Sequence, residues 1–304
     1  MKRWAPLLAV AILGATTTAS AFCRSTSCAG ECGRDDDNCK TLGAPLFWPS
    51  LCVGFALSHQ SSEHIPFSEF EALAIRSIAS WSSLACPQGE ASIAFVAQPA
   101  STCHTAEYNL TGGNANIVLF QDAKWNYKGA DNTLAKTTVT FDAVTGEILD
   151  ADIEVNHAYN EITTGDATVV YDLESILTHE FGHFIGLDHS LDFDATMNAT
   201  YDPGTSDLRT VEEDDVAGVC TIYPPNRVAT CEPTPHGGFS DACQLVAEEP
   251  GCSIAHGARW DAAAADPLGR NPGRHRPVGG IALGLLATLL IARRSGLRRG
   301  PSSR

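Results

Sequence analysis

Three histidines and a glutamate lie close together in the stretch HEFGHFIGLDH and have the types and spacing of a catalytic metal site. His179 and His183 are one helical turn apart, so their imidazoles face the same side of a helix. Zinc suits such nitrogens, and a catalytic zinc takes three protein ligands and leaves a fourth position for water. Gly186 can end the helix in a left-handed conformation, which lets His189 reach the same metal. Glu180 is then the expected general base, which takes a proton from the water and delivers it to the leaving amine.

A helix with buried, structural histidines is the alternative interpretation. It does not explain why Gly186 and His189 fall where they do. The complete pattern, HExxHxxGxxH with Met197 after it, resembles the signature of the metzincin zinc peptidases. Within that group the chain resembles the matrixin branch, which contains the matrix metalloproteinases.

Further matrixin features stand at four places in the sequence: Ser190 directly after the third histidine; Ala195-Thr196-Met197-Asn198, similar to the Met-turn; residues 213–224, similar to the last helix with its paired acids; and residues 137–156, similar to the edge hairpin of bacterial matrixin-like peptidases. In matrixins the methionine forms a hydrophobic floor beneath the metal, and the paired acids brace the Met-turn. The resemblance covers about residues 44–225 and is most specific over 172–223.

The resemblance implies an α+β, zincin-like metzincin catalytic domain. Its sheet is expected to be twisted, mostly parallel and five-stranded, with an antiparallel edge strand and three helices. The implied activity is that of a secreted zinc endopeptidase whose substrate lies extended along the edge strand, 136–141, and adds a strand to the sheet. Two other functions remain open: a zinc hydrolase acting on cell-wall peptides, and a catalytically inactive surface binding protein.

The sequence departs from matrixins at their other metal sites. Residues 121–136 contain no histidine, so a second, structural zinc is not predicted. Asp150 and Asp152 are compatible with calcium or with solvated acids at a strand end. Tyr201, four positions after the methionine, is expected either to line the substrate pocket or to pack within its loop.

Hydrophobic periodicity and turn residues predict the order of elements within residues 44–225. The expected elements are strands at 51–57, 92–97 and 117–120, a hairpin of 136–141 and 148–155, and helices at 66–84, 172–185 and 212–222. About 180 residues suffice for one well-packed domain.

The N-terminal residues 1–21 have the features of a secretory signal. Lys2-Arg3 precedes an apolar run, and Ala19-Ser20-Ala21 is a cleavage site of the A-x-A type, predicted to be cut after Ala21. Export agrees with the 11 cysteines of the chain.

Residues 22–43 form a cysteine-dense segment for which two interpretations stay open. Its four cysteines, Cys23, Cys28, Cys32 and Cys39, predict two local disulfides. Alternatively, Cys32 in ECGRD acts as a zymogen latch, because the sequence shares a cysteine, a glycine and an acid with the matrixin pro-segment motif and a thiolate binds zinc better than water does. Inside the next region, Cys86 and Cys103 are the expected disulfide pair.

The C-terminal part falls into two segments of different composition. Residues 226–277 are rich in Pro, Gly and Ala, contain three cysteines, and predict a linker or disulfide-bonded stalk. Residues 278–304 predict a short hydrophobic helix with an arginine-rich tail. Its apolar part spans about 22 Å, short of the ~30 Å hydrocarbon core. The arginines that follow it favour a membrane anchor or a bacterial-type sorting signal over the alternative, a helix buried in the globular domain.

Charge excludes one class of partner. Residues 44–225 contain five basic side chains against 26 acids, although the whole chain has a net charge of −16. So acidic a surface repels nucleic acid. The expected partners are protein or peptide substrates, and the expected oligomeric state is a monomer.

Overall fold

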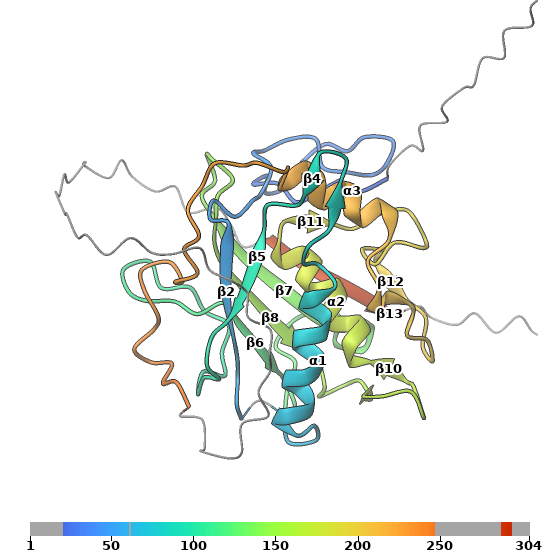
Figure 1. Cartoon of the computed structure of the whole chain (residues 1–304). Coiled ribbons are helices and arrows are strands. Elements are labelled where there is room, and N and C mark those ends of the chain that lie inside the picture. The colour runs from blue at the N-terminus through green and yellow to red at the C-terminus, as the bar shows by residue number, and fades with distance from the viewer. Residues whose placement is uncertain (1–20, 61, 247–286, 294–304) are drawn as a thin grey trace, which may run out of the picture.

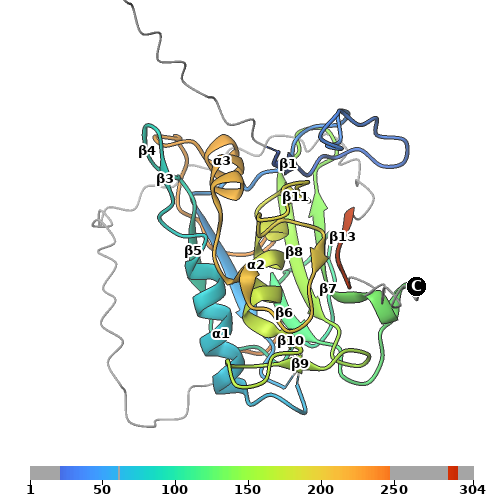
Figure 2. The same cartoon turned by 90° about the vertical axis from the view of Figure 1, so that its right-hand side faces the viewer.

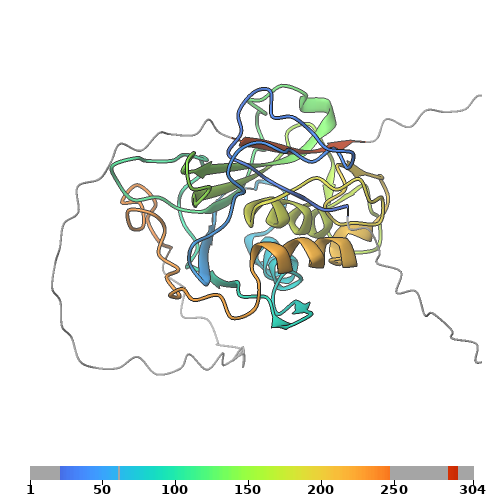
Figure 3. The same ribbon diagram turned by 90° about the horizontal axis from the view of Figure 1, so that it is seen from above.

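The computed structural model describes residues 21–60, 62–246 and 287–293, the last of these as backbone only. Figure 1 shows a twisted sheet with helices α1 and α2 packed side by side over one of its faces. Seen from above, α3 lies next to this helical layer (Figure 3). The helices are α1 (Phe67–Ala79), α2 (Leu173–Phe184) and α3 (Glu213–Ile222).

Five strands form the main part of the sheet in the order β7-β8-β6-β2-β5, and two further strands described below extend it beyond β7. They are β2 (Cys52–Leu57), β5 (Ala94–Ala97), β6 (Ile117–Phe120), β7 (Thr133–Phe141) and β8 (Ile148–Val155). The pairs β2–β5, β2–β6 and β6–β8 are parallel, and only β7 runs antiparallel to its neighbour β8. The predicted fold class, a mostly parallel five-stranded sheet with an antiparallel edge strand and three helices, is confirmed.

Short paired strands fasten the loops around this framework. They are β1 (Cys23–Arg24) with β11 (Leu187–Asp188), β3 (Ala85–Cys86) with β4 (Gly89–Glu90), and β9 (Ile162–Thr163) with β10 (Tyr171–Asp172). The first pair matters most for the site, because β11 directly precedes His189.

Helix α2 lies in the core, and all of its residues except Glu174 are buried. The Asp172 side chain caps its start by accepting a hydrogen bond from Ser175 N at 2.8 Å. One face of β8 packs in the same core as α2 through Ala151, Ile153 and Val155. The alternation of side chains along a strand therefore places the acids of β8 on the opposite face of the sheet.

Five disulfides join ten of the eleven cysteines, and the eleventh, Cys252, lies outside the described residues. The two predicted local bridges are present as Cys23–Cys39 and Cys28–Cys32. The predicted pair Cys86–Cys103 is wrong. The remaining bridges are Cys52–Cys231, Cys86–Cys220 and Cys103–Cys243. Each joins positions 134 or more residues apart, which short sequence spacing cannot indicate.

Residues 226–246, where the sequence predicts a linker or stalk, lie against the domain formed by the preceding residues. The guanidinium of Arg227 donates to the carbonyls of Trp48 at 2.6 Å and of Ser50 at 2.7 Å. Two of the long-range disulfides hold the same segment. This part of the chain is therefore fixed to the start of β2 through Cys52–Cys231 and to the loop after β5 through Cys103–Cys243.

The part of the predicted C-terminal helix that the structure describes is a strand, β13 (Ala287–Arg293). It pairs antiparallel with β7 and parallel with β12 (Thr200–Tyr201), and Figure 2 shows it in red beside β7. Pairing supplies partners for the backbone groups that β7 and β12 would otherwise leave open, which explains a strand in place of a helix. Residues 278–286 and 294–304 lie outside the described residues. In the described part of the chain no helix is long and apolar enough to cross a membrane.

Candidate metal centre

The three predicted ligands converge. The Nε2 atoms of His179 and His183 are 3.1 Å apart, and that of His189 lies 3.3 Å from the first and 3.1 Å from the second. His179 and His183 come from one face of α2, whereas His189 follows strand β11. The chain turns back towards the metal site at Gly186. Its φ of 95° is a left-handed conformation that favours glycine, and a Cβ here would lie 2.9 Å from the carbonyl oxygen of Leu46.

Hydrogen bonds to carbonyl groups determine which nitrogens face the centre. His179 Nδ1 lies 2.7 Å from Thr196 O, and His183 Nδ1 lies 2.9 Å from Leu187 O. A carbonyl oxygen only accepts, so each Nδ1 carries the proton and each Nε2 presents a lone pair. Burial lowers the pKa of His179 to about 3 and that of His189 to about 4, and it lowers the pKa of His183 as well.

These donors fit zinc. Nitrogens at 2.0–2.1 Å from a tetrahedral zinc are separated by about 3.3 Å, close to the spacing observed here. Lone pairs of neutral imidazoles that face one another at this distance repel unless a cation lies between them. Among the described residues, this triad is the only group of three or more His, Cys, Asp or Glu side chains placed to hold a metal ion.

Glu180 lies beside the triad with one free carboxylate oxygen. Its side chain is fully buried; Oε2 accepts a hydrogen bond from the Thr137 hydroxyl, and Oε1 has no partner. Burial raises the pKa of Glu180 to about 8, although the hydrogen bonds from Thr137 and the charge of Lys136 act in the opposite direction. Such a carboxyl group is suited to take up a proton and release it again.

The loop that follows His189 packs against α2 and contacts one of the three histidines. A Cβ on Gly182 would lie 2.1 Å from the Met197 sulfur, so this methionine packs directly against α2. The buried carboxylate of Asp215 accepts from the backbone N–H groups of Thr196 at 2.8 Å and Met197 at 3.0 Å. Since Thr196 O binds His179 Nδ1, the acid in α3 is connected to a metal-facing imidazole through this turn.

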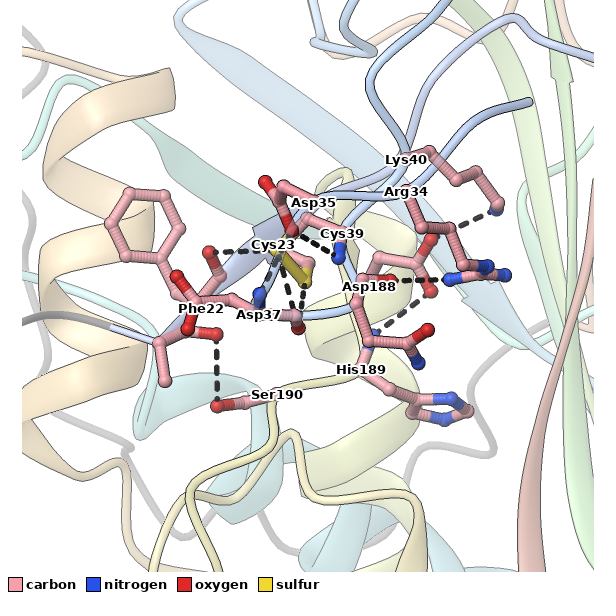
Figure 4. The surroundings of a disulfide bond; sticks show 12 residues. Phe22, Cys23, Arg34, Asp35, Asp37, Cys39, Lys40, Asp188, His189 and Ser190 are labelled. Carbon is pink, nitrogen blue, oxygen red and sulfur yellow. Dashed lines mark hydrogen bonds and ion pairs between the residues drawn. A yellow bond between two sulfur atoms is a disulfide. The ribbon is translucent and has the colours of Figure 1, made fainter.

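The N-terminal segment holds the other side of His189, which the sequence did not indicate. Cys23 pairs with Asp188 across β1 and β11, and Figure 4 shows the Cys23–Cys39 disulfide next to this pair. Asp188 Oδ2 forms an ion pair with Lys40 Nζ at 2.8 Å, and Asp188 Oδ1 accepts from His189 N at 2.9 Å. The latch interpretation is wrong for this structure, because Cys32 is bonded to Cys28 and has no free thiol.

Asp214 joins the start of the described chain to the residue after the third histidine. Ser190 Oγ donates to Asp214 Oδ2 at 2.7 Å. Asp214 Oδ1 accepts from the backbone N–H groups of Ala21 at 2.6 Å and Phe22 at 3.0 Å.

Three further residues singled out in the sequence, Asp150, Asp152 and Tyr201, are not part of the histidine triad. Asp150 and Asp152 lie on the face of β8 that points away from α2, and both are buried there. The interpretation as solvated strand-end acids is therefore wrong. Burial raises the pKa of both carboxyl groups, and each is raised further by a neighbouring acid. Tyr201 is also buried; its hydroxyl accepts from Asp172 N at 3.0 Å and donates to Thr205 O, which agrees with loop packing.

Comparison with known proteins agrees with this geometry. Residues 92–224 match the family model described as Matrixin. Over 62 residues the chain is 45% identical to Metalloendoproteinase 1-MMP of Arabidopsis thaliana, covering 20% of this chain and 17% of that protein. Over 133 residues it is 37% identical to Matrix metalloproteinase-20 of Homo sapiens, covering 42% of this chain and 26% of that protein. Over 66 residues it is 38% identical to Metalloendoproteinase 1 of Glycine max, covering 22% of this chain and 21% of that protein. The match thus spans about a quarter or less of each relative's length.

Proposed function

We propose that the matrixin domain of this chain is a zinc-dependent endopeptidase that hydrolyses internal peptide bonds of protein substrates. The observation that carries the proposal is the convergence of three metal-facing Nε2 atoms, together with the buried, unpartnered Oε1 of Glu180, the residue next to His179 in α2. Three nitrogen donors with one vertex left open are typical of catalytic rather than structural zinc sites. The function is proposed for the domain, since the chain matches only part of each relative.

His179, His183 and His189 are the residues that hold the metal, and their donor set fits zinc. Zinc supplies a Lewis acid that polarises the scissile carbonyl and acidifies the attacking water. Oε1 of Glu180 takes the proton from that water and passes it to the leaving nitrogen. The carbonyl groups of Thr196 and Leu187 keep two of the rings in the tautomer and orientation that this role requires.

The proposed substrate position is the slot between β7 and β12. An extended peptide there pairs antiparallel with β7 through backbone hydrogen bonds, so side-chain pockets set the selectivity. In the structure, β13 of the same chain occupies this slot. A substrate must therefore displace β13 before it reaches the metal centre.

An extracellular location is supported by the five disulfides. We place signal cleavage after Ala21, which makes Phe22 the new N-terminus. Its backbone nitrogen lies 3.0 Å from Asp214 Oδ1, so the new ammonium group gains an ionic partner at the domain surface. Anchoring at a membrane or cell surface through residues 278–304 is part of the same proposal. N-terminal sequencing and cell fractionation of the secreted protein test both.

Calcium at the buried acids of β8 is the one additional cofactor proposed. Asp150 is 1% exposed and its Oδ1 has no hydrogen-bond partner, while Asp152 Oδ1 accepts from Ile117 N at 2.9 Å. A hard cation held by oxygen ligands would satisfy the free oxygen and offset the repulsion between the two carboxylates. Titration of the chain with calcium, followed by the melting temperature, tests this; Asp150→Asn is the control that removes the response.

Incubation of the purified full chain with a random peptide library, with and without a chelator, tests the main function. We expect chelator-sensitive cleavage at internal bonds. Glu180→Gln should keep one zinc per chain and lose cleavage by at least about a thousandfold, because it removes the proton acceptor but none of the nitrogen ligands. Zinc binding by the parent without any cleavage would favour a binding protein, and cleavage of peptidoglycan peptides alone would favour a cell-wall hydrolase.

A further inference from the structure

Thr137 and Glu180 form a buried contact between the edge strand and the metal-site helix. Thr137 lies in β7, is 0% exposed, and donates its hydroxyl proton to Oε2 of Glu180. The same hydroxyl oxygen of Thr137 lies 3.2 Å from the backbone carbonyl oxygen of Glu180. The contact joins positions 43 residues apart, so only the packing of β7 on α2 creates it.

This contact makes the two oxygens of the carboxylate unequal. Oε2 is occupied by the threonine hydroxyl, whereas Oε1 is buried and has no partner. A carboxylate held at one oxygen cannot rotate freely, so its other oxygen keeps a constant direction. A general base must hold such a direction within hydrogen-bond reach of the proton that it removes.

No other side chain holds Glu180 among the described residues. The neighbouring base Lys136 has its Nζ 3.6 Å from the centre of the Tyr127 ring, on the other side of the strand. Tyr127 in turn donates its hydroxyl proton to Glu154. The orientation of Glu180 therefore depends on Thr137.

We propose that Thr137 is a positioning residue for the hydrolysis reaction: its hydroxyl fixes Oε2 of Glu180 and so directs Oε1 at the attacking water. The inference rests on the proposed endopeptidase function and assigns a role within the same site. Threonine at this position combines a strand-favouring, β-branched side chain with a hydroxyl donor. Valine has nearly the same shape and lacks only the donor.

The test compares Thr137→Val and Thr137→Ser with the parent in the full chain. We expect Thr137→Val to bind zinc normally, to keep KM, and to lose about 10- to 100-fold in kcat, the range that misorientation of a catalytic group produces. Thr137→Ser keeps the donor and should restore most of kcat. A second readout is independent of catalysis: the ¹³C chemical shift of the Glu180 carboxyl carbon in the zinc-free chain should change in Thr137→Val and stay close to the parent value in Thr137→Ser.

Ser77→Ala is the matched control. Ser77 is a buried hydroxyl of α1 that donates to the Glu174 carbonyl in α2 at 3.0 Å, so its loss removes a hydrogen bond to the same helix without touching Glu180. We expect reduced stability with an unchanged kcat. An unchanged kcat and an unchanged carboxyl shift in Thr137→Val would overturn the inference. Absence of cleavage by the parent would instead overturn the proposed function. In that case the ¹³C shift of the Glu180 carboxyl carbon in the two Thr137 variants would still show whether Thr137 holds Glu180.

Discussion

Lys40 and Asp188 form an ion pair of 2.8 Å that connects the N-terminal cysteine-rich segment to the residue before the third metal-facing histidine. The same carboxylate accepts a hydrogen bond from the backbone N–H of His189. In Figure 4 the Cys23–Cys39 bridge lies near Lys40 and Asp188, and it links the residue before Lys40 to β1, which pairs with β11. The segment therefore acts as a brace for the only ligand that does not come from α2.

Lys40→Met should weaken metal retention. The change leaves the Asp188 carboxylate, largely buried, without its cation, and removing one partner of such a pair costs about 1–3 kcal/mol. We expect faster zinc release to a chromogenic chelator in the variant. Arg76→Met is the control, because its ion pair with Glu174 at 2.9 Å lies on the more exposed surface of α1 and α2. Equal release rates in the two variants would contradict the bracing role of Lys40.

Asp215→Asn should remove a pH dependence of stability. Burial raises the pKa of Asp215 from an ordinary value of 3.8 to about 6. Between these pH values the folded chain binds a proton that the unfolded chain has lost, so the free energy of unfolding falls as the pH rises from about 4 to about 6, by at most about 3 kcal/mol. The asparagine variant cannot titrate, so urea unfolding of the zinc-free chain at pH 4.5 and 6.5 should show a smaller decrease than in the parent. Parallel curves for both chains would refute this explanation.

The disulfides should differ widely in their contribution to stability. Cys103–Cys243 closes a loop of 140 residues, whereas Cys28–Cys32 closes one of 4. Chain entropy alone predicts that double replacement by serine costs about 5 kcal/mol for the first pair and about 2 kcal/mol for the second. Melting temperatures of the two double variants measure the difference. A smaller loss for Cys103–Cys243 than for Cys28–Cys32 would show that the entropy of the unfolded chain is not the main source of stabilisation.

Disruption of β13 should increase cleavage of a small peptide. Leu289→Pro with Ile291→Pro removes two backbone donors and so weakens pairing with β7 and β12, which frees the slot for substrate. We expect a lower KM than in the parent, while Leu289→Val with Ile291→Val keeps the parent value. Added peptide with the sequence of residues 287–293 should inhibit the proline variant. The expectation fails if an active parent and the proline variant have the same KM.

The features that the sequence by itself determined are those that depend on the spacing of residues within one segment. The separation of His179 and His183, the glycine at 186, and the alternation along β8 each depend on one helical turn, one φ angle or one strand period. These local rules hold wherever the segment lies in the fold. They were enough to predict the metal-facing histidines and the individual strands and helices, whereas the five-stranded sheet with its antiparallel edge strand was expected from the resemblance to matrixins.

Tertiary structure alone decided the contacts between distant segments. The pairing of Thr137 with Glu180, of Lys40 with Asp188 and of Cys103 with Cys243 arises because strands and loops far apart in the chain pack together. The same packing buries Asp150 and Asp152 and places β13 against β7. No periodicity within one segment indicates which other segment will cover it, since that depends on the arrangement of the whole sheet.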